Sequence, residues 1–524
     1  MHVATAIARA DAAAAKGEWA VAESLLRTAV GNGHDDAPVL VKLGIVQFLQ
    51  NRLDDARKTL ALAVSHCETS FDAWYNFGCV LQKVRDLKGA RDCFRNALQL
   101  NAKSLDAKTN LAVVAFELGD TDESIAISYS ALVDHPQDAL TFANLSGFLR
   151  ARGASEEARL CAQAALGIDP AHPVALKALG TLEYDRRHYG AAIDYFLQAL
   201  RKDPENASLR LNVGMTALAL GDFSNGWREY EWRHGVMPYP EGAGGLGLPR
   251  WCGEAIKGKT LLLLAEQGNG DTLQFIRLAQ GVVARGGRVK AVVQPGLVRL
   301  LQRSPYLDEV VDAQSPPPAA DYHLPLMSLP FVLGLTQEGM PPFSPYVFPV
   351  AEEVAAWKKR LAGAGRIKIG LVWAGEARPH DPELNRMDER RSFPLETFAP
   401  LFRADDRHAW FSVQKGGAAA QAEAWPELID YSAEWGDFAG TAAFVANLDL
   451  VISVDTAVAH LAAAMGRPTW LLSRSDPCWR WLGNQERNLW YPTLRVFGQA
   501  SPGDWGRVIQ EVAESLPRFQ PPTD

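Results

Sequence analysis

The chain has 524 residues, and 53 Lys and Arg against 61 Asp and Glu give a formal net charge of -8. This balance argues against a nucleic-acid binder, which needs a basic surface to neutralise phosphates. It does not exclude a local basic groove. No run approaches the roughly 18 to 20 apolar residues of a membrane span. The six cysteines form no C-x-x-C pair, so we expect a cytoplasmic protein without structural metal or disulfides. The length predicts three or four folding units.

The first part of the chain repeats with a period of 34 residues. Small residues recur in three columns, which are Gly44, Gly78, Ala112, Ser146, Gly180 and Gly214; Ala56, Ala90, Ser124, Ala158, Ala192 and Gly226; and Ala63, Ala97, Ala131, Ala165 and Ala199. Small residues at fixed phases are typical of helix-turn-helix units whose two helices touch closely. The pattern resembles tetratricopeptide repeats (TPR), and it predicts a helical solenoid over residues 1 to 235.

Stacked repeats form a concave face, and such faces bind peptides or partner proteins. A fourth column, Asn76, Asn110, Asn144 and Asn212, recurs two residues before the first. These amides could hydrogen-bond an extended peptide, although contacts between helices explain them nearly as well. We expect a protein or peptide partner on this face. The alternative is a solubilising spacer, or one that forms a homo-oligomer through the repeats.

The second half of the chain has a different pattern of apolar and polar residues. Residues 236 to 254 are rich in glycine and proline and predict a linker. Beyond them, short apolar strands alternate with helical stretches, which predicts parallel sheets covered by helices on both faces. We expect two Rossmann-like domains, over residues 255 to 348 and 349 to 524, with a cleft between them. The last helix, near residues 505 to 516, could pack back across the first of these domains.

A block from Asp449 to Pro468 is the most informative stretch of the chain. A buried strand over residues 450 to 454 runs straight into Asp455 and Thr456, which can cap a helix of small apolar residues. The free N-H groups and the positive dipole end of such a helix favour an anion. The block therefore predicts a phosphate site beyond the carboxyl edge of the strand.

Five motifs together resemble the heptosyltransferase-type GT-B glycosyltransferases, in the bacterial branch that carries N-terminal TPR. These motifs cover residues 266 to 275, 370 to 375, 411 to 416, 455 to 460 and 476 to 481. The resemblance implies an α + α/β protein, with a TPR solenoid followed by the two Rossmann-like domains of a GT-B fold. It also implies an inverting, metal-independent transferase without a cofactor. Such an enzyme takes a nucleotide sugar as co-substrate on its C-terminal domain and an acceptor on its N-terminal domain.

Asp271 is the expected catalytic residue. It lies on a turn between a strand and a helix, where glycines let the backbone turn tightly. The resemblance implies that Asp271 is the general base for the acceptor hydroxyl, and that the acceptor-side loop comprises Gly268, Asn269, Gly270 and Gln274. The alternative is that Asp271 only caps the helix that follows.

The other site residues are expected to bind the donor. They are Trp373, Gly375, Arg391, Gln414, Lys415, Asp455, Thr456, Ala457, His460 and Trp479. A helix N-terminus contributes about 0.3 to 2 kcal/mol to an anion, so Lys415 or Arg391 is expected to share the diphosphate. The alternatives are surface positions for the two cations, a core position for His460 and inter-domain packing for Trp479. Residues 376 to 389 are expected to form a polar loop over the site.

These observations predict a glycosyltransferase that moves a sugar to a Ser or Thr hydroxyl of a protein selected by the repeats. Two alternatives stay open. One is a transferase that acts on a lipid-linked or surface glycan. The other is a non-catalytic TPR adaptor with a degenerate GT-B domain.

Overall fold

The computed structural model describes residues 3–31, 36–239, 246–362, 367–378, 380–403, 407–482 and 488–521. By its internal contacts the chain divides into two compact units, Met1–Leu179 and Gly180–Asp524. In the described ranges, no helix is both long and apolar enough to cross a membrane.

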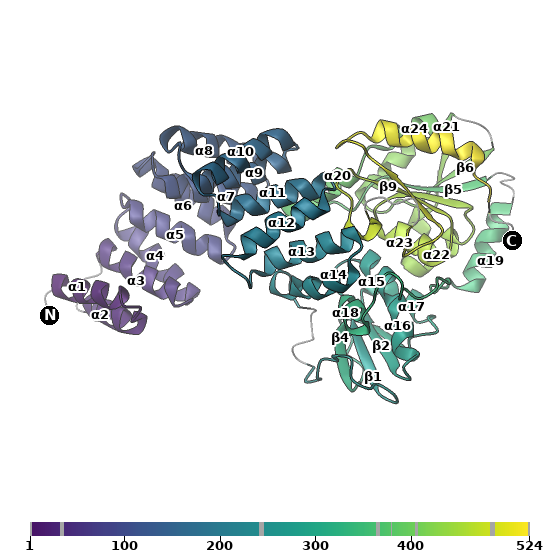
Figure 1. Ribbon diagram of the computed structural model, residues 1–524, viewed down its shortest axis with the longest axis horizontal. Coiled ribbons are helices and arrows are strands. Elements are labelled where there is room, and N and C mark those ends of the chain that lie inside the picture. Colours follow the sequence, from purple (N-terminus) through teal and green to yellow (C-terminus); the bar gives the residue numbers. More distant parts are fainter. Residues whose placement is uncertain are drawn as a thin grey trace. The chain divides into compact units, whose positions relative to one another are not determined.

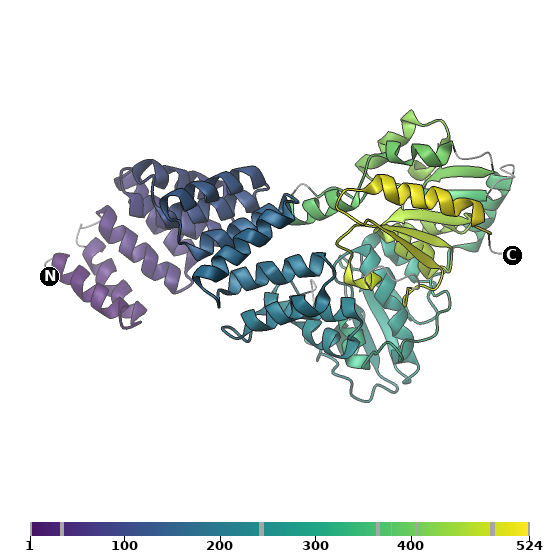
Figure 2. The ribbon, with the colours of Figure 1, turned by 45° about the horizontal axis from the view of Figure 1, so that its top comes forward.

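The first unit consists of antiparallel helix pairs, each stacked on the next (Figures 1 and 2). Its helices are α1 (Val3–Ala14), α2 (Trp19–Gly31), α3 (Ala37–Leu49), α4 (Leu53–His66), α5 (Phe71–Lys83), α6 (Leu87–Leu100), α7 (Leu105–Glu117), α8 (Thr121–Asp134), α9 (Ala139–Ala151), α10 (Ser155–Ile168) and the start of α11 (Pro173–Asp185). The helical series continues in the second unit with α12 (Tyr189–Leu200), α13 (Ala207–Leu220), α14 (Phe223–Tyr230) and the 3-10 helix η1 (Glu231–Gly235).

The small residues of the repeat columns lie where paired helices touch. A Cβ added to Gly44 would come within 2.5 Å of Leu60, and one added to Gly78 within 2.7 Å of Phe94. The alanines and the serine of the second and third columns are at most 1% exposed. A larger side chain at these positions would separate the two helices of a pair. The predicted helical solenoid is therefore confirmed.

The second unit contains two parallel sheets. The first has the strand order β3-β2-β1-β4 and the second has the order β10-β9-β8-β5-β6-β7. The strands of the first are β1 (Thr260–Leu264), β2 (Arg288–Val293), β3 (Glu309–Asp312) and β4 (Tyr322–Pro325). Those of the second are β5 (Ile367–Val372), β6 (His408–Ser412), β7 (Leu428–Asp430), β8 (Leu450–Val454), β9 (Thr469–Ser473) and β10 (Leu494–Gly498). The predicted α + α/β class is confirmed.

Helices cover both sheets, and most begin directly after a strand, as expected of a parallel topology. They are α15 (Asn269–Phe275), α16 (Ala279–Val283), α17 (Val298–Leu301), α18 (Leu329–Leu333), α19 (Ala351–Leu361), α20 (Pro382–Arg391), α21 (Ala399–Phe402), α22 (Phe438–Val445), α23 (Ala457–Ala464) and α24 (Trp505–Ser515). Strands β1, β5 and β8 have interiors that are almost entirely buried, because helices pack on both of their faces.

Two predictions about individual helices were wrong. Residues 376 to 389 do not form only a loop, because α20 begins within them, with Asp381 as its N-cap and Pro382 at its first position. Helix α24 does not cross the first sheet. Its buried face, which includes Trp505 and Ile509, packs in the core of the second sheet together with Phe393 and Leu472.

The compact units divide earlier than the predicted repeat boundary at residue 235. Trp227 and Tyr230 of α14 share one hydrophobic core with Leu261 and Phe275 of the first sheet and its helices. The end of the helical series is thus part of the second unit. The predicted ranges of the two Rossmann-like domains stay predictions, and residues 240 to 245 of the predicted linker lie outside the described residues.

Candidate active site

Each sheet reverses its strand order at one place. In the first sheet the chain runs outward from β1 to β3 on one side and places β4 on the other. In the second sheet the series β5 to β7 and β8 to β10 run outward in opposite directions from the β5–β8 pair. Doubly wound sheets bind ligands at such switch points, beyond the carboxyl ends of the strands. The turn that carries Asp271 follows β1, and Asp455 and Thr456 follow β8, so both motifs lie at switch points.

Asp271 is engaged at both carboxylate oxygens. Its Oδ2 accepts the Gly268 N-H at 2.9 Å, and the Asp271 N-H donates back to the Gly268 carbonyl at 3.1 Å. Its Oδ1 accepts a hydrogen bond from Arg480, whose side chain is buried in the short 3-10 helix η10 (Trp479–Trp481). Asp271 is therefore not the N-cap foreseen as the alternative, because Gly268 is the N-cap of α15 and Asp271 lies within the first turn of that helix. Its carboxylate instead accepts the N-H of the N-cap residue, and it forms an ion pair with Arg480 that the sequence did not indicate.

The start of α15 packs on the start of α23, and Figure 1 shows the two helices side by side. A Cβ on Gly270 would lie 2.8 Å from His460 Cδ2, so glycine permits this close approach. The helix η10 joins the two turns, since Arg480 holds Asp271 while the adjacent Trp481 Nε1-H donates to Asp455 Oδ2 at 3.0 Å. The structure thus brings together two motifs that lie far apart in the sequence.

His460 is buried beside Asp455. Its Nδ1 lies 3.0 Å from the Tyr491 hydroxyl and its Nε2 lies 3.9 Å from Asp455 Oδ1, while its ring stacks on Trp481. Burial lowers the pKa of His460 to about 4, although Asp455 and Asp271 oppose this shift. Burial would raise the pKa of Asp455, but His460, Arg391 and the Trp481 hydrogen bond together lower it. A neutral imidazole therefore lies against an ionised carboxylate near pH 7.

Arg391 reaches the turn after β8. Its Nη1 donates to the Asp455 carbonyl at 2.6 Å, and its Nη2 pairs with Asp388 on the same helix. A Cβ on Gly375 would come within 2.6 Å of Arg391 Nε, so the glycine after β5 makes room for the guanidinium. Among the described residues, the buried Nε of Arg391 has no hydrogen-bond partner. A buried, unpartnered cationic donor beside a helix N-terminus suits an anionic ligand.

Gln414 and Lys415 follow β6. The Gln414 Oε1 accepts the backbone N-H groups of Trp373 and Ala374 at 3.0 and 2.9 Å, so its side chain braces the end of β5. The Lys415 amine donates to the carbonyls of Ser432 and Trp435, and burial lowers the pKa of Lys415. In this structure the Lys415 amine is thus engaged by two backbone carbonyls, while Arg391 reaches the turn after β8.

Trp479 lies in an aromatic cluster. It is 3% exposed, and its ring meets Trp227 edge-on at a centroid distance of 5.4 Å and Tyr230 at 5.7 Å. This is the packing arrangement foreseen as the alternative to stacking on a ligand. On the acceptor-side loop, Gln274 is fully buried, and neither polar atom of its amide has a partner in the described part of the chain. The roles predicted for these residues in binding stay predictions.

Sequence reasoning missed several residues that organise this site. Arg480 and Trp481 lie inside a motif already singled out, but no contact with Asp271 or Asp455 was predicted for either of them. Tyr491 and Asp388 carry no local signal. Their contacts with His460 and Arg391 arise only when strands and helices have packed.

Family models match two parts of the chain. A tetratricopeptide-repeat model matches residues 7–69, 75–140 and 177–225, and a glycosyltransferase family 9 (heptosyltransferase) model matches residues 435–477, which include the Asp455 block. The chain therefore contains tetratricopeptide repeats and a segment similar to glycosyltransferase family 9. These matches support a glycosyltransferase.

Among curated proteins, the chain is similar to Protein FlbA of Caulobacter vibrioides, with 26% identity over 522 residues, covering 85% of this chain and 84% of that protein. Solved structures similar to it include TPR proteins from Parabacteroides merdae and Thermus thermophilus. The first shares 15% identity at a TM-score of 0.41 and covers 46% of this chain and 94% of its own. The second shares 16% identity at a TM-score of 0.32 and covers 35% and 99%.

Proposed function

We propose that the chain transfers a sugar from a nucleotide sugar to a Ser or Thr hydroxyl of a protein held by the repeats. The observation that carries this proposal is the meeting of two βα turns, one with Asp271 and one with Asp455, Thr456 and Ala457. Each turn lies at the switch point of its own parallel sheet. Such a pair of sheets is the arrangement expected of a GT-B enzyme.

The donor diphosphate belongs at the start of α23 in this proposal. The first N-H groups of a helix have no partner within the helix, and the dipole adds a partial positive charge there. Arg391 lies at the same turn and carries a positive charge, and its Nε has no partner within the ranges that the structure describes. Gly375 has no side chain, which leaves room for the Arg391 guanidinium at this turn.

The reaction is a direct displacement without a metal. The acceptor hydroxyl gives its proton to the Asp271 carboxylate while its oxygen bonds to the anomeric carbon of the sugar. The bond between that carbon and the diphosphate oxygen breaks, and the nucleoside diphosphate leaves. Arg480 holds the Asp271 carboxylate in one orientation, and a general base of this kind contributes about 10² to 10⁴ in rate.

One observation favours the alternative of a TPR adaptor with a degenerate domain. Both carboxylate oxygens of Asp271 already accept hydrogen bonds, as expected of a purely structural residue. An adaptor needs no nucleotide, whereas either enzyme proposal requires one.

Two measurements distinguish the proposed functions: binding of nucleotides to the chain, and the mass of acceptor proteins. The full chain is mixed with UDP, GDP, ADP and dTDP and with their sugar derivatives, and its melting temperature is recorded. A rise with one base is expected, and no rise with any of them would favour the adaptor. Intact-mass measurement of proteins co-expressed with the chain then tests the acceptor. A gain of one sugar mass on a Ser or Thr supports the protein acceptor, and a modified glycan without modified protein would refute it.

A further inference from the structure

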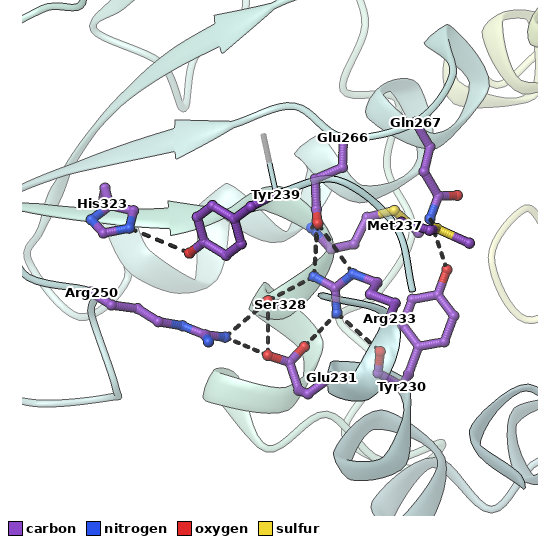
Figure 3. A network of polar contacts seen from close by, with 11 residues as sticks. Tyr230, Glu231, Arg233, Met237, Tyr239, Arg250, Glu266, Gln267, His323 and Ser328 are labelled. Atoms are coloured by element: carbon purple, nitrogen blue, oxygen red, sulfur yellow. Dashed lines mark hydrogen bonds and ion pairs between the residues drawn. The ribbon is translucent and has the colours of Figure 1, made fainter. Parts of the chain in front are cut away.

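The switch point of the first sheet is filled by the chain's own last repeat. Figure 3 shows the Arg233 guanidinium of η1 between Glu266, which follows β1, and Ser328, which follows β4. Arg233 is 1% exposed. Its Nη2 donates to Glu266 Oε2 at 2.9 Å and to Ser328 Oγ at 2.8 Å, and its Nε donates to Glu266 Oε1 at 3.1 Å. A side chain of the repeat helices thus occupies the place where such sheets usually receive a ligand.

The charges around Arg233 are matched by further partners. Glu231 accepts from Arg233 Nη1 at 2.6 Å, and its second oxygen accepts from Ser328 and Arg250 (Figure 3). Glu266 Oε2 also accepts the Met327 N-H at 3.2 Å. A buried ionic network with every group partnered holds its members in one geometry, although it adds little net stability. This network therefore fixes where Glu266 lies.

The next residue, Gln267, has a strained backbone. Its φ of 55° lies in the left-handed region, which a non-glycine residue adopts only at a cost. The Gln267 Nε2 donates to the Tyr230 hydroxyl of α14 at 3.3 Å (Figure 3), and the Gln267 carbonyl accepts from Gln294 at 3.1 Å. The surrounding contacts thus hold Gln267 in this conformation. The turn that follows it contains Gly268 and Asp271.

Tyr230 also lies near Asp271, the proposed general base, and Arg480. Burial raises the pKa of Tyr230, and the charges of Arg480, Arg233 and Asp271 act on it as well. Its ring packs against Trp479, which adjoins Arg480. The hydroxyl that holds Gln267 is therefore close to the ion pair that holds Asp271.

We propose that Tyr230 and Arg233, at the end of the repeat helices, are positioning residues that set the conformation of the Asp271 turn through Gln267 and Glu266. The proposal rests on the function proposed above. The positioning role of Tyr230 and Arg233 implies that the second unit needs the last repeat for catalysis. The preceding repeats are then free to select the acceptor. A shift of about 1 Å in a reacting group can cost about 100-fold in rate, so a turn held in a strained state needs such support.

The test removes the Tyr230–Gln267 hydrogen bond from either side in the full chain. Tyr230→Phe deletes the hydroxyl. Gln267→Asn keeps an amide one methylene too short to reach Tyr230, and Asn tolerates the left-handed region well, as Asn51 does in this chain at a φ of 59°. The readout is release of UDP, GDP, ADP or dTDP from the corresponding sugar nucleotide by transfer to water, with kcat and KM measured separately.

Each variant is expected to lower kcat about tenfold with KM within about twofold, and the double variant is expected to lose no more than the single ones. Melting temperatures should stay close to that of the unmodified chain. Arg85→Asn, at another left-handed position with a φ of 66°, and Arg210→Gln, which removes an ion pair between α13 and α14, are the matched controls and should keep full kcat.

Unchanged kcat in the two variants would overturn the proposal, as would losses that multiply in the double variant. A fall in kcat that merely follows a loss of folded protein would also overturn it, because both residues would then be structural. An unmodified chain that binds and turns over no sugar nucleotide would refute the proposed function itself. That outcome is seen without any variant, so the two failures are distinct.

Discussion

The two switch points of the second unit are built in opposite ways. At the first, the space between β1 and β4 is occupied by Arg233, and Glu266, Ser328 and Glu231 partner its guanidinium. At the second, the turn after β8 presents the start of α23. The cation beside it, Arg391, keeps one buried N-H for which the described part of the chain offers no partner.

This difference assigns different tasks to the two sheets. An arginine whose N-H groups all donate within the chain holds a fixed geometry, whereas one that keeps a buried N-H without a partner in the described residues is suited to an anion from outside. The first sheet then serves to hold the Asp271 turn. In the proposed reaction, the second sheet holds the leaving diphosphate.

Truncation should break this arrangement most severely. Deleting residues 1–172 leaves α11 and all later helices in place, so the second unit should fold and still release nucleoside diphosphate from its donor. Deleting residues 1–235 removes Trp227 and Tyr230, which share a hydrophobic core with Leu261 and Phe275. The deletion therefore exposes the apolar surface that these aromatic side chains cover, at a cost of about 25 cal/mol for each Å². We expect this second fragment to melt far lower or to aggregate.

Melting curves and donor turnover of the two fragments check this prediction. Equal melting temperatures would mean that the last repeat is only a spacer. The shorter deletion should also abolish modification of a protein acceptor, and undiminished modification would refute the selecting role of the repeats.

Asp271→Asn should come next in size. The amide cannot take a proton from the acceptor, so turnover should fall about 100- to 10,000-fold while nucleoside diphosphate binding is kept. The variant leaves Arg480 buried without a carboxylate, which lowers stability for a separate reason. The paired variant Asp271→Asn with Arg480→Gln removes both charges, and it should regain melting temperature without regaining activity. Full turnover in the single variant would reduce Asp271 to a structural residue.

Arg391→Gln should weaken nucleoside diphosphate binding about tenfold, because one charge-assisted hydrogen bond is lost. Lys415→Gln is the comparison variant, since the Lys415 amine donates to the Ser432 and Trp435 carbonyls instead. Calorimetric titration with UDP, GDP, ADP or dTDP measures both. A larger loss for Lys415→Gln than for Arg391→Gln would place the diphosphate away from the start of α23.

The features that could be predicted from the sequence are those set by its periodicity and by local patterns of residues. The 34-residue columns revealed the paired helices because glycines of the first column face a large side chain on the second helix of their own repeat. Gly44 faces Leu60, for example, and Gly78 faces Phe94.

The strand β8 matches its predicted bounds, since a short run rich in β-branched residues leads directly into the helix start at Asp455 and Thr456. Helix α20 was missed although Asp381 and Pro382 form a clear start signal, because the polar sequence after them lacks an apolar face.

Long-range pairing explains the remaining differences. The position of α24 depends on β10 pairing with β9, which puts the end of the chain on the second sheet. Arg480 pairs with a carboxylate 209 residues away, and Arg233 with one 33 residues away. Neither partner is marked by any spacing in the sequence. The two turns could be predicted, but the cations that hold them could not.

A separate prediction concerns His460 and the pH dependence of stability. Its pKa is ordinarily near 6.5 and is about 4 in the folded chain, so only the unfolded chain takes up this proton between those two values. Stability should therefore fall as the pH drops from about 6.5 toward 4, by about 2 kcal/mol at pH 5 from this group.

The variant His460→Asn tests this prediction. Its side chain cannot titrate, yet its carbonyl oxygen can still accept from the Tyr491 hydroxyl. Melting temperatures at pH 7 and 5 should thus fall less in the variant than in the unmodified chain. His234, whose pKa burial also lowers to about 4, is present in both chains and cancels in this comparison. Parallel losses in the two chains would mean that His460 is protonated against Asp455 in the folded state, and the second switch point would then carry one more positive charge than proposed.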